Sequence, residues 1–191
     1  KRPVECFSEN IHNDIKGLTI GLPKEYFTEQ LDSKIGEALT QCIDVLSKLG
    51  ANIKEISLPQ TDLAISTYYV LAPAEASANL SRFDGVRYGY RCQDPIDLND
   101  LYTRSRSEGF GDEVKRRILI GTYVLSSGYY NAYYRKAQKL RRLFCDDFNN
   151  AFKEVDCILT PTTPSTAFTN GKQHTPEVHY LADAYTVAVK F

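Results

Sequence analysis

A strand, a helix and a second strand follow one another near the start of the chain, and this order constrains the fold more than any other feature. Residues 17–23 form a short apolar run between Gly and Pro, which is typical of a strand. Residues 32–49 carry apolar side chains every three or four positions, and Asp32 or Ser33 can cap the helix that this spacing predicts. Residues 51–59 predict the second strand. Because the links are short, the three elements predict a βαβ unit with two parallel strands, which places the chain in the α/β class.

Helices are expected to fill most of the middle of the chain. Apolar periodicity and turn residues place them at 62–80, 97–106, 111–127 and 130–153. Pro73 should kink or break the first of them. The third is expected to turn three apolar side chains inward, namely Val114, Ile118 and Leu125. A further strand is predicted at 155–161, and a last element begins near Tyr180.

Composition narrows the class of protein. The chain has 191 residues, of which 42% are hydrophobic and 25% charged, and its formal net charge is −1. These values are ordinary for a soluble globular protein, and the net charge by itself points to neither nucleic acid nor membrane. No Met occurs, not even at position 1. We therefore expect a processed chain or an internal piece of a longer one.

The cysteines and histidines do not form a metal-binding pattern. Five cysteines are an odd number, and none of them forms a Cys-x-x-Cys pair. A zinc site needs closely spaced ligands, which the three histidines do not supply either. A disulfide framework is not expected from an odd number at wide spacing. The sequence therefore predicts reduced thiols, a cytoplasmic protein and no metal site.

Positive charge and tyrosine gather in the middle of the chain. Residues 82–142 hold 13 Lys and Arg against 7 Asp and Glu, which leaves a local net charge of +6. The stretch from Tyr68 to Tyr134 holds 10 of the 13 tyrosines. Such a segment suits an anionic ligand or a polar interface, and it also suits a solvated helical surface. Composition leaves these alternatives open.

Motifs for a catalytic nucleophile are absent from the sequence. It contains no Gly-x-Ser-x-Gly elbow, no Ser-x-x-Lys and no phosphate-binding loop. The Ser-Ser-Gly at 126–128 falls at a predicted helix end, where it is expected to break and cap the helix. Patterns alone therefore define an α/β chain with a basic, tyrosine-rich face.

Four unusual strings extend this interpretation. They are APAEASANLSRFDGVRYG at 72–89, SEGFGDEVKRRILIGTYVLSSGYY at 107–130, DCILTPTTP at 156–164 and YLAD at 180–183. In this order they resemble the amidase signature family, and within it the glutamine-hydrolysing A subunits of tRNA-dependent amidotransferases. The resemblance covers about residues 16–189, and the string from Glu75 to Tyr90 distinguishes this branch from other members. It implies part of the amidase-signature fold, a mixed sheet flanked by helices, incomplete here, with residues 1–191 as a single partial domain.

The resemblance also implies an activity for the whole subunit. Members of this branch hydrolyse glutamine to glutamate and ammonia with a Ser nucleophile, a bridging Ser and a Lys base. That triad belongs to a Gly/Ser-rich segment that this sequence lacks, so no catalytic residue is assigned and the chain is expected to be inactive alone. Subunits B and C complete a heterotrimer, in which a partner uses ATP and Mg to amidate Glu-tRNA(Gln) or Asp-tRNA(Asn). No cofactor is expected on this chain, and no membrane.

Three residues are assigned to glutamine by the resemblance. Arg117 is expected to bind the α-carboxylate, because a planar guanidinium offers a fork that matches a carboxylate. Asp183 is expected to bind the α-ammonium, and Tyr68 to line the pocket and donate a hydrogen bond. Arg116 and Tyr69 are the neighbouring alternatives. Without the resemblance, these residues suit a helix surface, a helix cap and half-buried packing.

A structural role is expected for the polar residues of the first string. Four of them are expected to form a buried polar network, namely Glu75, Asn79, Arg82 and Asp84. Gly85 and Gly89 are expected to adopt turn conformations. One departure from the family lies at the other end of the chain, where Lys190 stands in place of an Asn.

Two further hypotheses remain open from the sequence. The first places the chain in another amidase-signature enzyme that hydrolyses fatty or aryl amides, in which Arg117 and Asp183 would have no charged group to bind. The second is a non-catalytic module that uses its basic middle to bind RNA or a partner protein.

Overall fold

The computed structural model describes residues 4, 6–11, 13–28, 31–168, 170 and 182–191. Contacts divide the chain into two compact units. The first comprises Lys1–Thr61 and Cys145–Lys190, and the second comprises Asp62–Phe144 with Phe191. The single partial domain over 1–191 stays a prediction.

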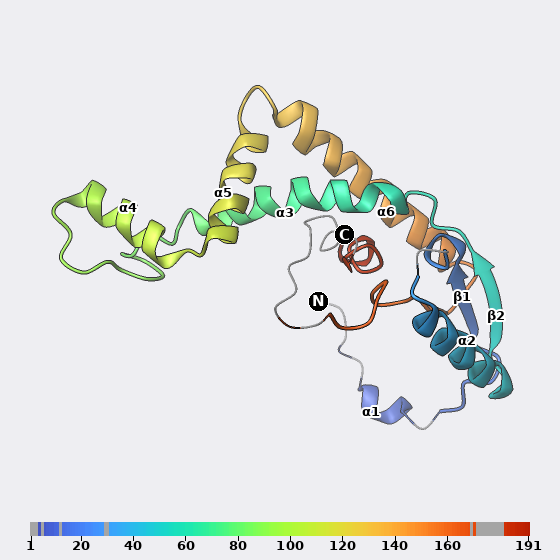
Figure 1. The fold of residues 1–191 in the computed structure, drawn as a ribbon. Helices are drawn as coiled ribbons and strands as arrows, with labels where there is room; N and C mark the ends of the chain where they lie inside the picture. Colours follow the sequence, from blue (N-terminus) through green and yellow to red (C-terminus); the bar gives the residue numbers. More distant parts are fainter. Residues whose placement is uncertain (1–3, 5, 12, 29–30, 169, 171–181) are drawn as a thin grey trace. The chain divides into compact units, whose positions relative to one another are not determined.

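The first unit is built on a small parallel sheet (Figure 1). Its strands are β1 (Thr19–Pro23), β2 (Asn52–Ile56) and β3 (Cys157–Ile158), in the order β2-β1-β3. Helix α2 (Ser33–Lys48) connects β1 to β2, so the predicted βαβ unit and the α/β class are confirmed. Both pairings of β1 are parallel, and the described strands include no antiparallel neighbour of the kind that the expected mixed sheet contains.

Short elements complete this unit. They are α1 (Phe7–Asn10), η1 (Lys24–Tyr26) and η4 (Ala188–Lys190), and η2 (Thr61–Leu63) follows at the boundary between the units. The predicted start of the last element near Tyr180 lies outside the described residues, and from residue 182 onward the chain forms a helical residue and a turn that leads into η4.

Local sequence explains the ends of these elements. Asp32 caps α2, because its carboxylate accepts a hydrogen bond from the Lys34 backbone N–H at 2.9 Å. Gly50 ends the same helix with a φ of 92°, a conformation that glycine adopts without strain. At the start of β1, the Asp156 carboxylate accepts a hydrogen bond from the Thr19 backbone N–H at 2.8 Å, which fixes β3 beside β1.

The core of the first unit joins segments from both of its parts. It consists of Tyr26, Ile56, Leu58, Ala151, Val155 and Tyr185. Tyr185 packs edge-on against Tyr26 with ring centroids 5.4 Å apart. Val187, two residues further on, is fully buried. The segment that carries Asp183 is therefore anchored in this core by the residues that follow it.

Glu25 provides a pH-dependent contribution to the stability of this unit. Burial raises the pKa of its carboxyl, but hydrogen bonds from the Leu58 backbone N–H and the Ser57 hydroxyl outweigh burial, so the pKa lies below the usual 4.5. The contribution is therefore present above the unfolded-state pKa and is lost as the pH falls through the folded-state pKa.

Replacing Glu25 by Gln should lower the free energy of unfolding at pH 7 by about 1–2 kcal/mol, because the Leu58 backbone N–H and the Ser57 hydroxyl lose a charged acceptor. The wild-type protein should lose this difference between about pH 5 and pH 3. Urea unfolding at pH 7, 5 and 3 measures both effects. A constant difference between the two proteins across this range would contradict the assignment.

The second unit is helical. Its helices are α3 (Ala64–Leu80), α4 (Leu98–Gly109) and α5 (Asp112–Leu125), followed by a π-helical turn, η3 (Tyr130–Tyr134), and by the first part of α6 (Arg135–Ala151). The four predicted helices are therefore present, and the last one begins as a π-helix. None of the helices in the described part of the chain combines the length and the apolar character that crossing a membrane requires.

Helices α3 and α5 approach each other closely, as Figure 1 shows. A Cβ atom added to Gly121 would lie 2.0 Å from the backbone oxygen of Pro73. Gly121 and Val124 are the buried residues of α5, whereas the predicted inward residues Val114, Ile118 and Leu125 are only half-buried. The prediction named the large apolar residues, but the contact is made where a residue without a side chain lets the backbones meet.

Pro73 lies inside α3 and is buried there. Of the predicted kink or break at this residue, the break is wrong, because α3 continues to Leu80, and the kink stays a prediction. A proline removes one hydrogen bond from a helix interior. This part of α3 packs against α5, where Gly121 lies close to the Pro73 backbone.

Helix α4 is tied to the end of α3 by side chains. Nη1 of Arg106 donates hydrogen bonds to the carbonyl oxygens of Leu80, at 2.8 Å, and Phe83, at 3.0 Å. The hydroxyl of the buried Ser105 accepts a hydrogen bond from the Cys92 backbone N–H at 3.0 Å. The loop between the two helices is therefore held by polar contacts at its start and at Cys92.

Candidate functional site

Arg117 lies in the second turn of α5 and its side chain is 40% exposed. Its Nε donates a hydrogen bond to Oε1 of Glu113 at 2.9 Å. Among the described residues, the two terminal nitrogens of this guanidinium make no hydrogen bond. Arg117 therefore keeps one complete fork of donors for a ligand.

Glu113 lies one turn earlier and holds two arginines. It accepts hydrogen bonds from Nε and Nη2 of Arg116, both at 2.9 Å, in addition to the one from Arg117. Hydrogen bonds from Arg117 and Arg116 lower the pKa of Glu113, and the same contact raises the pKa of Arg117. The three side chains carry one net positive charge when all are ionised.

Tyr68 and Tyr69 lie close to Arg117. Their phenol groups are near enough to raise the pKa of the Arg117 guanidinium, after the larger effect of Glu113. The two rings contact each other edge to face, with centroids 5.3 Å apart. The tyrosines lie on α3 and Arg117 on α5, the two helices whose backbones meet at Pro73 and Gly121.

Asp183 belongs to the first unit and is half-buried. Its backbone oxygen accepts hydrogen bonds from the backbone N–H groups of Thr186, at 3.1 Å, and Val187, at 3.0 Å. Its carboxylate makes no ion pair with any of the described residues. Asp183 therefore lies at the start of an anchored turn.

The structure thus brings together two of the three predicted residues. Tyr68 and Arg117 share the second unit, with the alternatives Tyr69 and Arg116 beside them. Arg116 uses two of its donors on Glu113, whereas Arg117 uses one. Roles in glutamine binding for Tyr68, Arg117 and Asp183 stay predictions.

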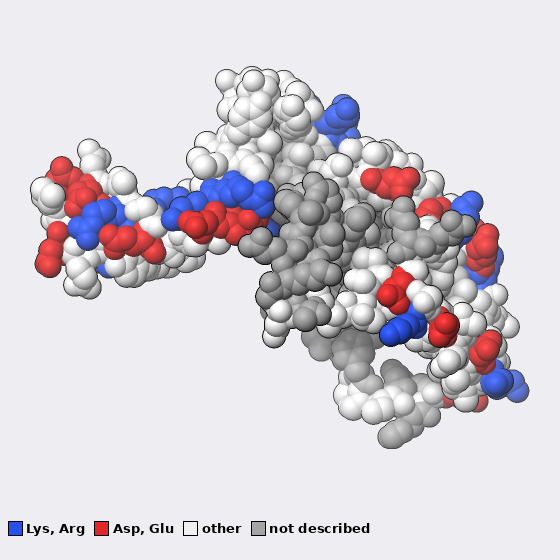
Figure 2. Space-filling model, in the orientation of Figure 1, with Lys and Arg blue, Asp and Glu red and all other residues white. Residues whose placement is uncertain are grey.

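The basic middle of the chain is internally paired over α4 and α5. Figure 2 shows Lys and Arg interleaved with Asp and Glu over this part of the molecule. Arg104 pairs with Asp100 and Glu108, and Lys115 pairs with Asp112, all at helical spacing. This arrangement is typical of a solvated helical surface, one of the alternatives that composition left open.

The predicted buried polar network is not observed. Glu75, Asn79 and Arg82 are exposed in this structure. The carboxylate of Asp84 instead accepts hydrogen bonds from the backbone N–H groups of Val86 and Arg87, and these bonds lower its pKa to about 2. The four residues are close in sequence, but most of them extend from a helix end that faces solvent.

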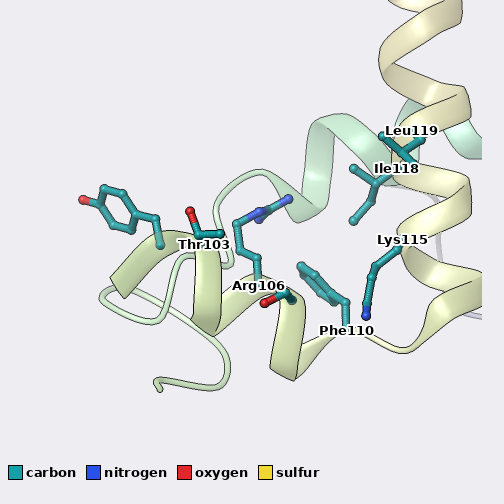
Figure 3. Close-up of a pocket in the computed structure, with 8 residues that line it drawn as sticks. Thr103, Arg106, Phe110, Lys115, Ile118 and Leu119 are labelled. Carbon is teal, nitrogen blue, oxygen red and sulfur yellow. The ribbon is translucent and has the colours of Figure 1, made fainter. Parts of the chain in front are cut away.

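A cavity of about 440 Å³ between α4 and α5 was not predicted from the sequence. Figure 3 shows Arg106 and Phe110 on one side and Lys115, Ile118 and Leu119 on the other. The Arg106 guanidinium lies 5.1 Å from the centroid of the Phe110 ring. None of the three predicted site residues lines this cavity. The sequence feature that could have indicated this cavity is Phe110, an aromatic residue between two glycines.

No group of His, Cys, Asp and Glu that is suited to hold a metal ion occurs among the described residues. All five cysteines are free thiols in the structure.

Two solved structures share the fold of this chain. A bacterial aryl acylamidase of the amidase signature family aligns with 100% of this chain and 38% of its own, with a TM-score of 0.67 and 18% identity, which shows the fold alone. The A subunit of glutamyl-tRNA(Gln) amidotransferase from Thermotoga maritima aligns with 94% of this chain and 34% of its own, with a TM-score of 0.67 and 34% identity. The expected portion of the amidase-signature fold is therefore confirmed.

Comparison of sequences leads to the same family. The amidase family matches residues 1–191, and the chain belongs to this family. It is 58% identical over 190 residues to the A subunit of glutamyl-tRNA(Gln) amidotransferase of Thioalkalivibrio sulfidiphilus, and 60% identical over 187 residues to that of Coxiella burnetii. These alignments cover 99% and 97% of this chain, which spans 39% of the length of either relative.

Proposed function

We propose that this chain is part of the glutamine-hydrolysing A subunit of a tRNA-dependent amidotransferase. A Ser-Ser-Lys triad outside these residues releases ammonia from glutamine in the intact protein. Arg117 binds the α-carboxylate of glutamine, Asp183 binds its α-ammonium and Tyr68 lines the pocket. The relatives at 58% and 60% identity support the choice of this branch of the family.

The observation that carries this proposal is the state of Arg117. A neutral amide substrate has no group for a cation, whereas Arg117 offers a half-exposed guanidinium whose terminal nitrogens make no hydrogen bond among the described residues. Glutamine carries a carboxylate that matches this fork.

The proposal extends to partners. Subunits B and C complete a heterotrimer in the cytoplasm, and one of these partners uses ATP and Mg to activate the Glu or Asp carried on mischarged tRNA before ammonia is added. This chain binds no cofactor itself. The internal pairing of charges over α4 and α5 argues against an independent RNA-binding role for that surface.

The 191 residues alone should release no ammonia from glutamine, because the proposed nucleophile lies outside them. The intact subunit in its complex should release ammonia from glutamine faster than from a neutral primary amide such as butanamide. A coupled assay for ammonia measures both. Turnover by the isolated chain contradicts the placement of the triad, and a preference of the complex for butanamide favours the other branch of the family.

A further inference from the structure

We propose that Glu113 is a positioning residue that orients Arg117 for end-on binding of the glutamine α-carboxylate, an inference that rests on the proposed function. The first step concerns the donors of Arg117. A guanidinium has two edges that can bind a carboxylate with two parallel hydrogen bonds, one formed by Nε with a terminal nitrogen and one formed by both terminal nitrogens. Because Glu113 occupies Nε at 2.9 Å, only the edge with both terminal nitrogens remains complete.

The second step concerns the freedom of the side chain. An arginine that is 40% exposed samples many rotamers unless a partner holds it. Glu113 lies one turn away on the same helix, and its carboxylate is itself fixed by two hydrogen bonds from Arg116. Glu113 therefore restricts the orientation of Arg117 before the substrate arrives.

The third step concerns charge. Two arginines and one glutamate leave a single positive charge, which one substrate carboxylate neutralises. Without Glu113, two adjacent guanidinium groups would repel each other and would compete for the same carboxylate. Glu113 thus directs the substrate to Arg117 and keeps Arg116 engaged.

The test is a double-mutant cycle in the intact subunit within its complex. E113Q keeps the size of the side chain but removes its charge, and it should raise KM for glutamine about tenfold with kcat within about twofold of wild type. The same change made in an R117A background should raise KM no further, because Glu113 acts through Arg117. The matched control is D112N, which removes a neighbouring negative charge from the same helical turn without touching Arg117.

Each other outcome overturns the inference. An unchanged KM in E113Q shows that Arg117 needs no positioning. If D112N raises KM for glutamine as much as E113Q does, the effect comes from the total negative charge at this end of the helix and not from Glu113 in particular. A further rise in the R117A background, or a loss of kcat together with a lower melting temperature, assigns Glu113 to packing. If the wild-type complex hydrolyses no glutamine, the proposed function itself is wrong. This failure is distinguishable from a failure of the Glu113 inference, because it is seen in the wild-type complex without any variant.

Discussion

Replacing Arg117 by Ala in the intact subunit should raise KM for glutamine about 100-fold. The two charge-assisted hydrogen bonds that its free edge can make to a carboxylate are together worth about 3 kcal/mol, and each 1.4 kcal/mol is a factor of about ten in affinity. R117K keeps the charge but cannot offer two parallel donors, so it should recover only part of the loss. Steady-state kinetics of ammonia release measure both variants.

The control for this prediction is the neighbouring arginine. R116A removes the same charge from the same helix. Arg116, however, donates two hydrogen bonds to Glu113 and is more exposed than Arg117. It should raise KM much less than R117A. If R116A has the larger effect, the carboxylate ligand is Arg116 and the assignment must move by one residue.

The helices and strands were predicted well where the apolar residues repeat at a clear spacing. The βαβ unit followed from the apolar spacing of α2 and the Gly and Pro residues that end its strands. The faces of α5 were not predicted, because hydrophobic periodicity selects large side chains and the contact with α3 is made by Gly121. A glycine inside a helix carries no signal of what it faces.

The candidate site was predicted in part for a similar reason. Tyr68 and Arg117 came from a resemblance to a family, and local sequence alone would have placed both on an ordinary helix surface. Glu113 precedes Arg117 by four residues, a spacing typical of many solvated ion pairs. That Glu113 accepts hydrogen bonds from both Arg116 and Arg117 depends on side-chain geometry, which a single sequence does not contain.

Replacing Gly121 by Ala should destabilise the protein by about 3 kcal/mol or more. The new methyl group would lie 2.0 Å from the Pro73 backbone oxygen and 2.6 Å from Cβ of Ser77. A helix backbone cannot rotate away as a flexible side chain can, so α3 and α5 must separate. Thermal unfolding of the intact subunit should show a lower melting temperature. KM for glutamine should rise as well, because this contact sets the distance between Tyr68 and Arg117.

Gly36 provides the matched control, since it also lies inside a helix but no atom of the described residues outside its own helix backbone lies within 4 Å of the position where its Cβ would be. G36A should stabilise α2 by about 0.5–1 kcal/mol, because alanine loses less conformational entropy than glycine in a helix. The opposite signs of the two substitutions separate a steric effect at Gly121 from the general effect of replacing glycine in a helix. If G121A is tolerated as well as G36A, α3 and α5 do not meet at Pro73, and the placement of Tyr68 beside Arg117 loses its structural basis.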